Sequence, residues 1–209
     1  SIVLSYQWDY FVSASLYLQL VEQEATDLVI IDKELLRRSW YLEHLELQYP
    51  LVIQQSKLEL DAYRKELYKF EHSLPYNSNV IEYHYTNFMR SIIDKNYQTK
   101  RIYVTPEIEL RYTGGYERVP SGLAFQLFAD TMYHPINVPN YNFRMSSKKN
   151  QYVDGITSLY ARSYYHHAVY AAKYGKSEEA FSLVSKALGI KSDFPEAEMF
   201  QKELRARLQ

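Results

Sequence analysis

Two uninterrupted apolar runs, separated by one helical stretch, constrain the fold of this chain more than any other feature. The first is Ile2-Val3-Leu4 and the second is Leu28-Val29-Ile30-Ile31. A run without polar alternation is typical of a strand that is covered on both faces of a sheet. Between the two runs, four apolar residues recur at steps of three and four: Phe11, Ala14, Leu18 and Val21. They predict the inner face of a helix, with Asp9 as its cap. Strand, helix, strand in this order predicts a parallel pair joined by a right-handed crossover.

The pattern of helices and strands continues to about residue 130. Ser39 is expected to cap a second helix, and Pro50 limits its extension. Two further helical faces follow, formed by Leu60, Tyr63, Leu67 and Phe70, and by Ile81, Tyr85, Phe88 and Ile92. Residues 101–105 predict another parallel strand, and residues 123–127 alternate like an edge strand. We therefore expect residues 1–132 to form an α/β domain with a Rossmann-like, mainly parallel sheet and helices on both faces.

The last third of the chain has a different character. Residues 133–151 are rich in proline, asparagine and basic residues, which predicts a linker wrapping the surface. Residues 152–209 have a purely helical pattern. Six residues there fall at positions resembling a tetratricopeptide repeat (TPR): Tyr164, Ala168, Gly175, Ala180, Val184 and Ala187. Small residues let two helices approach closely, and Gly175 stands where the chain must reverse. We expect a TPR-like hairpin, followed by a final helix from Pro195 to Leu208.

Composition excludes several classes of function. The formal net charge is −1, with 24 basic and 25 acidic side chains, so no basic excess points to nucleic acid as a partner. The absence of cysteine excludes disulfides and thiolate metal sites. No apolar run approaches the roughly 18 residues of a membrane span. Tyrosine is abundant, with 22 residues, and suits either a core or a surface that contacts proteins or sugars.

The first two predicted strands end in polar side chains that could form a ligand site. No glycine-rich phosphate loop follows the first strand, which argues against ordinary dinucleotide or nucleoside triphosphate binding, and no cofactor is expected. Open α/β sheets bind ligands at the carboxyl ends of their strands. The candidate ligand-binding residues are Tyr6, Trp8, Asp9, Asp32, Arg37, Arg38 and Tyr41. The alternative is purely structural: Asp9 caps a helix, Trp8 packs, and the arginines are solvated.

The histidines do not define a catalytic or metal site. His84 has no partner at a recognisable spacing, and the adjacent His166 and His167 point in different directions on a helix. No serine–histidine–aspartate set, paired carboxylates or metal-ligand spacing can be defended. We therefore expect no catalytic residues and no metal.

Loose sequence motifs over residues 1–130 resemble a known family. They are Tyr17-Leu18-Gln19, Asp27-Leu28-Val29-Ile30-Ile31-Asp32, Leu35-Leu36, Trp40-Tyr41, Arg101-Ile102-Tyr103-Val104-Thr105 and Pro120-Ser121-Gly122-Leu123-Ala124. This part resembles the soluble portion of bacterial DUF2723 proteins, multi-spanning membrane proteins related to protein O-mannosyltransferase-like glycosyltransferases. The chain departs from them at Ala25-Thr26, where Arg-Pro is usual. The resemblance implies that transfer chemistry belongs to the membrane helices of a longer parent chain.

Together these observations lead to three hypotheses of function. The first is a non-catalytic, extracytoplasmic C-terminal domain of a bacterial membrane protein, which binds a partner protein or a glycan handled by the membrane part. The abrupt apolar start at Ser1 suggests a piece of a longer protein. The second is an enzyme with its site around Asp9 and Asp32. The third is a soluble TPR-type scaffold that binds a peptide, for which a cytoplasmic location is the alternative.

Overall fold

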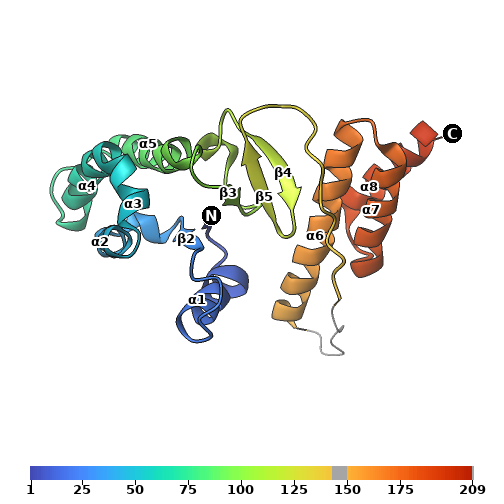
Figure 1. Ribbon diagram of the computed structural model, residues 1–209, viewed down its shortest axis with the longest axis horizontal. Helices are drawn as coiled ribbons and strands as arrows, with labels where there is room; N and C mark the ends of the chain where they lie inside the picture. Colours follow the sequence, from blue (N-terminus) through green and yellow to red (C-terminus); the bar gives the residue numbers. More distant parts are fainter. Residues whose placement is uncertain (143–149, 209) are drawn as a thin grey trace. The chain divides into compact units, whose positions relative to one another are not determined.

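A computed structural model describes residues 1–142 and 150–208, and the chain forms two compact units (Figure 1). Unit 1 is Ser1–Tyr116 and unit 2 is Glu117–Gln209. The predicted α/β class is confirmed, because strands and helices follow one another through the chain. The units divide earlier than the boundary expected at residue 132. The reason is that β4 (Glu117–Ser121) contacts α6 (Gln151–Lys173), which assigns its hairpin to the C-terminal helices.

Unit 1 contains a parallel sheet of three strands in the order β2-β1-β3. These are β1 (Ile2–Ser5), β2 (Val29–Asp32) and β3 (Ile102–Val104). β1 pairs in parallel with both neighbours, so that Val3 lies beside Ile30 on one side and Tyr103 on the other. Every residue of β1 and β2 is buried, as expected for apolar runs without alternation. The predicted parallel arrangement of the three strands is confirmed.

The connection from β1 to β2 differs from its predicted pattern. The chain first makes a π-helical turn, η1 (Trp8–Val12), and then continues as α1 (Ser13–Leu20). A π turn holds more residues than an α turn, so the side chains that follow it rotate to another face. The predicted inner residues Ala14, Leu18 and Val21 are exposed, and Val12 and Gln19 are buried instead. The predicted cap is also wrong, because Asp9 lies inside η1 and makes no side-chain cap.

A group of helices connects β2 to β3. They are η2 (Leu35–Arg37), α2 (Ser39–Gln48), α3 (Pro50–Ile53), η3 (Gln54–Ser56), α4 (Lys57–Glu71) and α5 (Ser78–Asn96), and η4 (Leu110–Tyr112) follows β3. The predicted faces of α4 and α5 are largely confirmed: Leu60, Tyr63, Leu67, Tyr85, Phe88 and Ile92 are buried. Ser39 does not cap α2 with its side chain. Instead, the Ser39 N–H donates to the Glu71 carboxylate at 3.0 Å. A side chain of α4 thus satisfies a backbone N–H at the amino end of α2.

Unit 2 begins with an antiparallel hairpin of β4 and β5 (Ala124–Phe128). The turn between them contains Gly122 with φ +62°, a conformation that favours glycine. The sequence predicted β5 as an edge strand but missed β4. The cause is Pro120, which lacks an N–H and contradicts the usual signature of a strand, although here it pairs opposite Phe125.

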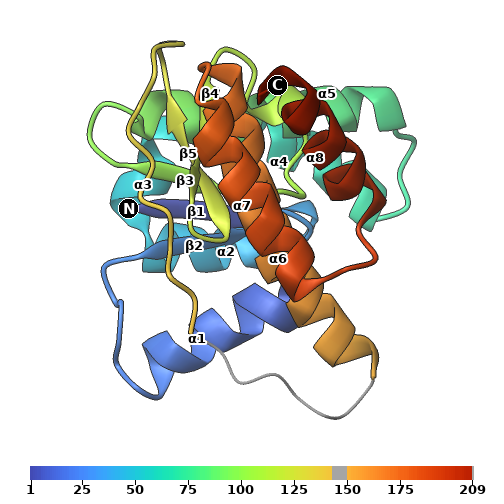
Figure 2. The ribbon, with the colours of Figure 1, turned by 90° about the vertical axis from the view of Figure 1, so that its right-hand side faces the viewer.

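Three helices complete unit 2: α6, α7 (Ser177–Ile190) and α8 (Pro195–Leu208). α7 contacts both α6 and α8, and the three lie side by side (Figure 2). Gly175, with φ +77°, provides the reversal between α6 and α7 that its position predicted. The core of unit 2 combines small residues with a few larger ones, among them Ala161, Tyr164, Ala168, Ala180, Val184 and Ala187. Pro195 begins the final helix as predicted.

The predicted linker 133–151 is described only in part, because residues 143–149 lie outside the described residues. Residues 133–142 form no helix or strand, and they are held against α6 by tyrosine hydroxyls. The Tyr164 hydroxyl donates to the carbonyl of Pro139 at 3.0 Å, and the His134 N–H donates to the Tyr170 hydroxyl at 2.9 Å. This part of the segment therefore belongs to the packing of unit 2.

Candidate functional site

The carboxyl edge of the parallel sheet is filled by the chain's own side chains. The chain passes from β1 to β2 on one side, and from β2 back across β1 to β3 on the other side. Ligands commonly bind at such a switch point, where the strand order reverses. Here the Thr105 hydroxyl donates to Ser5 Oγ at 3.1 Å across that point. The Gln7 N–H donates to the same oxygen, also at 3.1 Å. Both hydroxyl side chains are buried, so this edge is closed by internal hydrogen bonds.

Lys33, directly after β2, is a buried cation at the same edge. Its Nζ lies 3.0 Å from both carboxylate oxygens of Glu109 and 3.1 Å from Glu34. It also lies 4.6 Å from the centre of the Tyr6 ring. Burial would lower the pKa of Lys33, but the two carboxylates outweigh it, and the pKa is raised. Lys33 therefore stays charged and ties β2 to the segment after β3.

Asp32 stabilises a local turn. Its Oδ1 accepts hydrogen bonds from the N–H groups of Glu34 and Leu35, at 2.8 and 2.9 Å, and so holds the turn that leads into η2. The Asp32 N–H donates to the Tyr41 hydroxyl at 3.0 Å. Burial raises the pKa of the Asp32 carboxyl, although the two backbone N–H groups oppose it, and burial raises the pKa of Tyr41 to about 12. Both predicted residues are engaged in holding the backbone between β2 and α2.

Tyr6, Trp8 and Asp9 follow β1 and are exposed. The Tyr6 ring packs beneath Lys33, as described above. Trp8 and Asp9 lie in η1, and within the described part of the chain the Asp9 carboxylate contacts no hydrogen-bond or ion-pair partner. No hydrogen bond joins Asp9 to Asp32 among the described residues. The structure thus places Asp9 in η1 and Asp32 at the end of β2, without making the two carboxylates a working pair.

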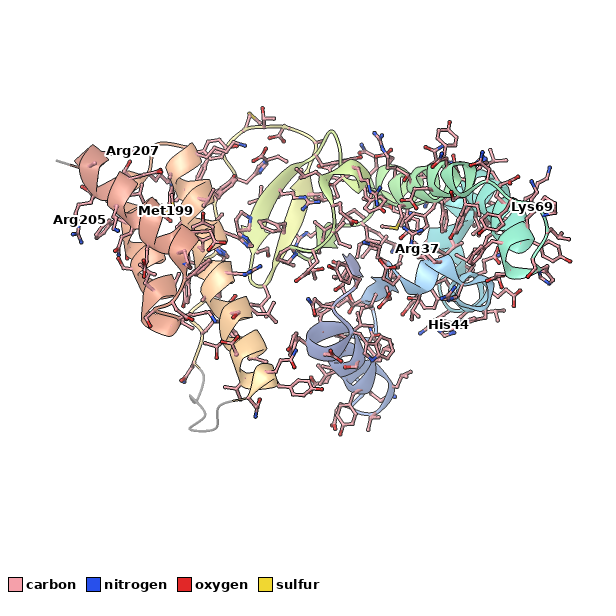
Figure 3. All side chains as sticks on the ribbon, turned by 180° about the vertical axis from the view of Figure 1, so that it is seen from behind. Arg37, His44, Lys69, Met199, Arg205 and Arg207 are labelled. Atoms are coloured by element: carbon pink, nitrogen blue, oxygen red, sulfur yellow. The ribbon has the colours of Figure 1, made fainter. Side chains whose placement is uncertain are left out.

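Arg37 and Arg38 lie beside a separate pocket of unit 1, which has a volume of about 490 Å³. The pocket opens between η2 and the two long helices α4 and α5. Arg37 (labelled in Figure 3) donates to Glu82 at 2.9 Å, and its guanidinium lies 4.0 Å from the centre of the Tyr85 ring. Arg38 is exposed and has no carboxylate within 4.0 Å among the described residues. One arginine is therefore fixed, whereas the other is free to meet a ligand.

The rest of the pocket wall is aromatic and apolar. Phe70, at the end of α4, and Tyr76, before α5, meet edge to face with ring centres 5.2 Å apart. They are 44% and 51% exposed, so their rings form an open rim. Leu35, Leu67 and Ile81 line the pocket further in. A volume of this size with a few placed polar groups matches the usual character of small-ligand sites.

Tyr63 lies at the floor of this pocket with an unsatisfied hydroxyl. Its ring is buried between Tyr85 and Phe88, with ring centres 5.5 and 6.1 Å away. The hydroxyl has no hydrogen-bond partner in the described part of the molecule. Burial raises the pKa of Tyr63 most strongly, and the next largest influences are the charges of Arg37 and Glu82. Tyr63 lines the same pocket as Arg37 and Glu82, and its hydroxyl is a donor that a ligand oxygen could satisfy.

Sequence reasoning identified the two arginines but missed most of this pocket. Tyr63, Phe70 and Ile81 were assigned to helical faces, and their role in lining a cavity needs the packing of α4 against α5. One available signal was the turn at residues 74–78, whose exposed Tyr76 follows the exposed Phe70 by six positions. Lys33 and Glu109 were also missed, because 75 residues of sequence separate the members of that ion pair.

Comparisons with known proteins do not assign the chain. No group of three or more metal-ligating side chains occurs in the described ranges, and no described helix is long and apolar enough to span a membrane. A scan against protein-family models finds no match. Searches of the curated proteins and of the solved structures find no match either. The resemblance to DUF2723 proteins therefore stays a prediction.

Proposed function

We propose that this chain is a non-catalytic, extracytoplasmic binding domain of a bacterial membrane protein, and that its pocket holds a glycan handled by the membrane part. One observation carries the proposal: a pocket of about 490 Å³ combines an open aromatic rim with the ion-paired side chains of Glu34, Arg37 and Glu82. Aromatic rings pack against the C–H groups of a sugar, while paired polar side chains satisfy its hydroxyls. The DUF2723 resemblance supplies the membrane context.

Two further interpretations of the fold accompany this proposal. The crossover β1–α1–β2 and the strand order are consistent with a Rossmann-like sheet that has lost its phosphate loop. The α6–α7 hairpin, with alanines at its contact and Gly175 at its turn, supports a TPR-like interpretation. A TPR-like pair favours a protein partner as a second ligand, bound to unit 2 rather than to the pocket.

The geometry gives less support to the alternative of an enzyme at the strand ends. Asp32 Oδ1 accepts two backbone hydrogen bonds, and neither the Asp32 nor the Asp9 carboxylate hydrogen-bonds another titratable side chain among the described residues, so the acid–base pair of a catalytic site is not assembled. Turnover of nucleotide sugars by this chain, lost in Asp9→Ala or Asp32→Ala, would move the enzyme hypothesis to first place.

The binding proposal is tested by titrating the 209-residue chain with gluco- and manno-oligosaccharides and following its amide signals by NMR. We expect shifts confined to residues around the pocket. Tyr76→Ala removes one rim ring and should weaken binding, whereas Tyr83→Ala removes an exposed tyrosine that does not line the pocket and should not. Saturating oligosaccharide without shifts at the pocket would contradict the proposal.

A further inference from the structure

The ion pairs around the pocket leave one cation without a carboxylate partner among the described residues. Glu82 is bound by Arg37 at 2.9 Å and by Arg111 at 3.2 Å. Glu34 is bound by Lys33 at 3.1 Å and lies 3.6 Å from Arg37. Each carboxylate that lines the pocket is thus shared between two cations, and neither is available to neutralise a further positive group.

Arg38 is that cation. The ion-pair network contains Lys33, Arg37 and Arg111 against Glu34, Glu82 and Glu109, three charges of each sign. Arg38 adds a fourth cation to the pocket wall without an ion-pair partner among the residues described. The nearby Glu71 keeps its negative charge and accepts from the Ser39 N–H, but it does not lie within 4.0 Å of the Arg38 guanidinium, whose donors stay free in the described part of the chain.

A second, independent observation points to a ligand oxygen at the same place. The Tyr63 hydroxyl is buried and lacks a partner in the described structure, while the residue lines the pocket that contains Arg38. A buried donor without an acceptor is costly, and such a group calls for an explanation such as a missing ligand. The free guanidinium and the unpaired hydroxyl thus belong to two residues that line one pocket.

We propose that the pocket binds an acidic saccharide, whose carboxylate or phosphate group pairs with Arg38 while a sugar oxygen accepts a hydrogen bond from Tyr63. This inference rests on the proposed function and narrows its ligand class. The sugar ring packs against Phe70 and Tyr76 at the rim. Arginine suits this role because its planar donors match both carboxylate and phosphate oxygens. The paired carboxylates Glu34 and Glu82 then accept from sugar hydroxyls.

The test measures the affinity of the full chain for D-glucuronate, glucose 6-phosphate and glucose by NMR titration, with acetate and inorganic phosphate as anions without a ring. We expect both acidic sugars to bind at the pocket about tenfold more tightly than glucose, since a charge-assisted hydrogen bond contributes at this level. Acetate and phosphate should bind more weakly than the corresponding sugars. Comparing glucuronate with glucose 6-phosphate shows which acidic group the pocket prefers.

Two variants locate the contacts. Arg38→Gln should remove the tenfold preference, whereas Arg90→Gln, an exposed arginine of α5 outside the pocket, should leave it intact. Tyr63→Phe should weaken sugar binding about two- to tenfold without lowering the melting temperature, because it removes a hydroxyl that has no partner in the unliganded protein. Unchanged affinity in Tyr63→Phe would overturn the contact with that hydroxyl.

The outcomes separate this inference from the function on which it rests. If glucose binds the pocket as tightly as the acidic sugars, the acidic ligand class is overturned and glycan binding remains. If no saccharide, acidic or neutral, perturbs the pocket, both proposals fail.

Discussion

Unit 1 surrounds a parallel sheet with large aliphatic and aromatic side chains, whereas unit 2 brings two helices together over alanines. In unit 1 the fully buried residues include Leu60, Tyr63, Tyr85 and Phe88. In unit 2 the residues with no exposed surface include Ala161, Ala168, Ala171, Ala180 and Ala187. A core of large side chains is sensitive to the loss of volume, and a contact between small ones is sensitive to its gain. The two units should therefore fail under opposite kinds of substitution.

The largest expected effect comes from removing volume in unit 1. Leu60→Ala should lower the free energy of unfolding by about 2–5 kcal/mol, because Leu60 is fully buried. Leu58→Ala is the matched control: Leu58 lies two residues away on α4 and is 80% exposed, so its loss should cost little. Both tryptophans, Trp8 and Trp40, lie in unit 1, so denaturant unfolding followed by their fluorescence reports on this unit. Equal midpoints for the two variants would contradict the packing of α4.

Adding volume to a buried position should destabilise unit 2. Ala180→Leu is expected to cost about 1–3 kcal/mol, since α6 and α7 leave no room for a larger side chain at this fully buried position. Glu178→Leu introduces the same side chain at an exposed position of α7 and should be nearly neutral. Thermal unfolding followed by far-ultraviolet circular dichroism compares the two. A variant Ala180→Leu that melts like the parent would show that the helices are not in close contact there.

A smaller effect distinguishes the two aspartates that the sequence grouped into one site. Asp32→Ala should destabilise unit 1 by about 1 kcal/mol, because it leaves the N–H groups of Glu34 and Leu35 without their acceptor. Asp9→Ala, at an exposed residue of η1, should have no measurable effect. Tryptophan fluorescence again gives the readout. Similar losses for both would mean that Asp9 has a structural contact that the fold does not show.

A pH dependence of unit 2 is also expected from His166. Burial lowers the pKa of His166 to about 4, assisted by Arg162 and His167. The unfolded chain titrates near 6.5, so between pH 6.5 and about 4 it binds the proton more tightly than the folded chain. The free energy of unfolding should therefore fall as the pH falls through this window. His166→Gln should show a weaker fall than the parent in denaturant titrations at pH 7 and pH 5. An identical fall would contradict a buried, neutral His166.

The sequence predicted those parts of the fold in which one local pattern decides the structure. The three parallel strands, the inner faces of α4 and α5 and the turn at Gly175 all follow from apolar runs, helical spacing or a glycine. The face of α1 was wrong because a single π turn changes the phase of every residue after it. β4 was missed because Pro120 hides its strand character.

The candidate site was harder to predict because its members act across long separations. Arg37 was identified from its sequence neighbours, but its partner Glu82 lies 45 residues away on α5. The Tyr63 hydroxyl has no hydrogen-bond partner among the described residues, and no sequence pattern reveals this. Whether an arginine is fixed, like Arg37, or free, like Arg38, also depends on which carboxylates the fold brings close.

The tyrosine hydroxyls described above have a consequence for the backbone. Outside helices and strands, backbone amide and carbonyl groups lack regular hydrogen-bond partners. In this chain, tyrosine hydroxyls form hydrogen bonds with several of these groups. Tyr41 accepts from the Asp32 amide, and Tyr85 donates to the carbonyl of Lys33. Tyr170 likewise accepts from the amide of His134, which lies in a segment with no regular structure. Amides held in this way exchange their hydrogen with solvent slowly, so unit 2 carries its protection against exchange beyond the ends of its helices.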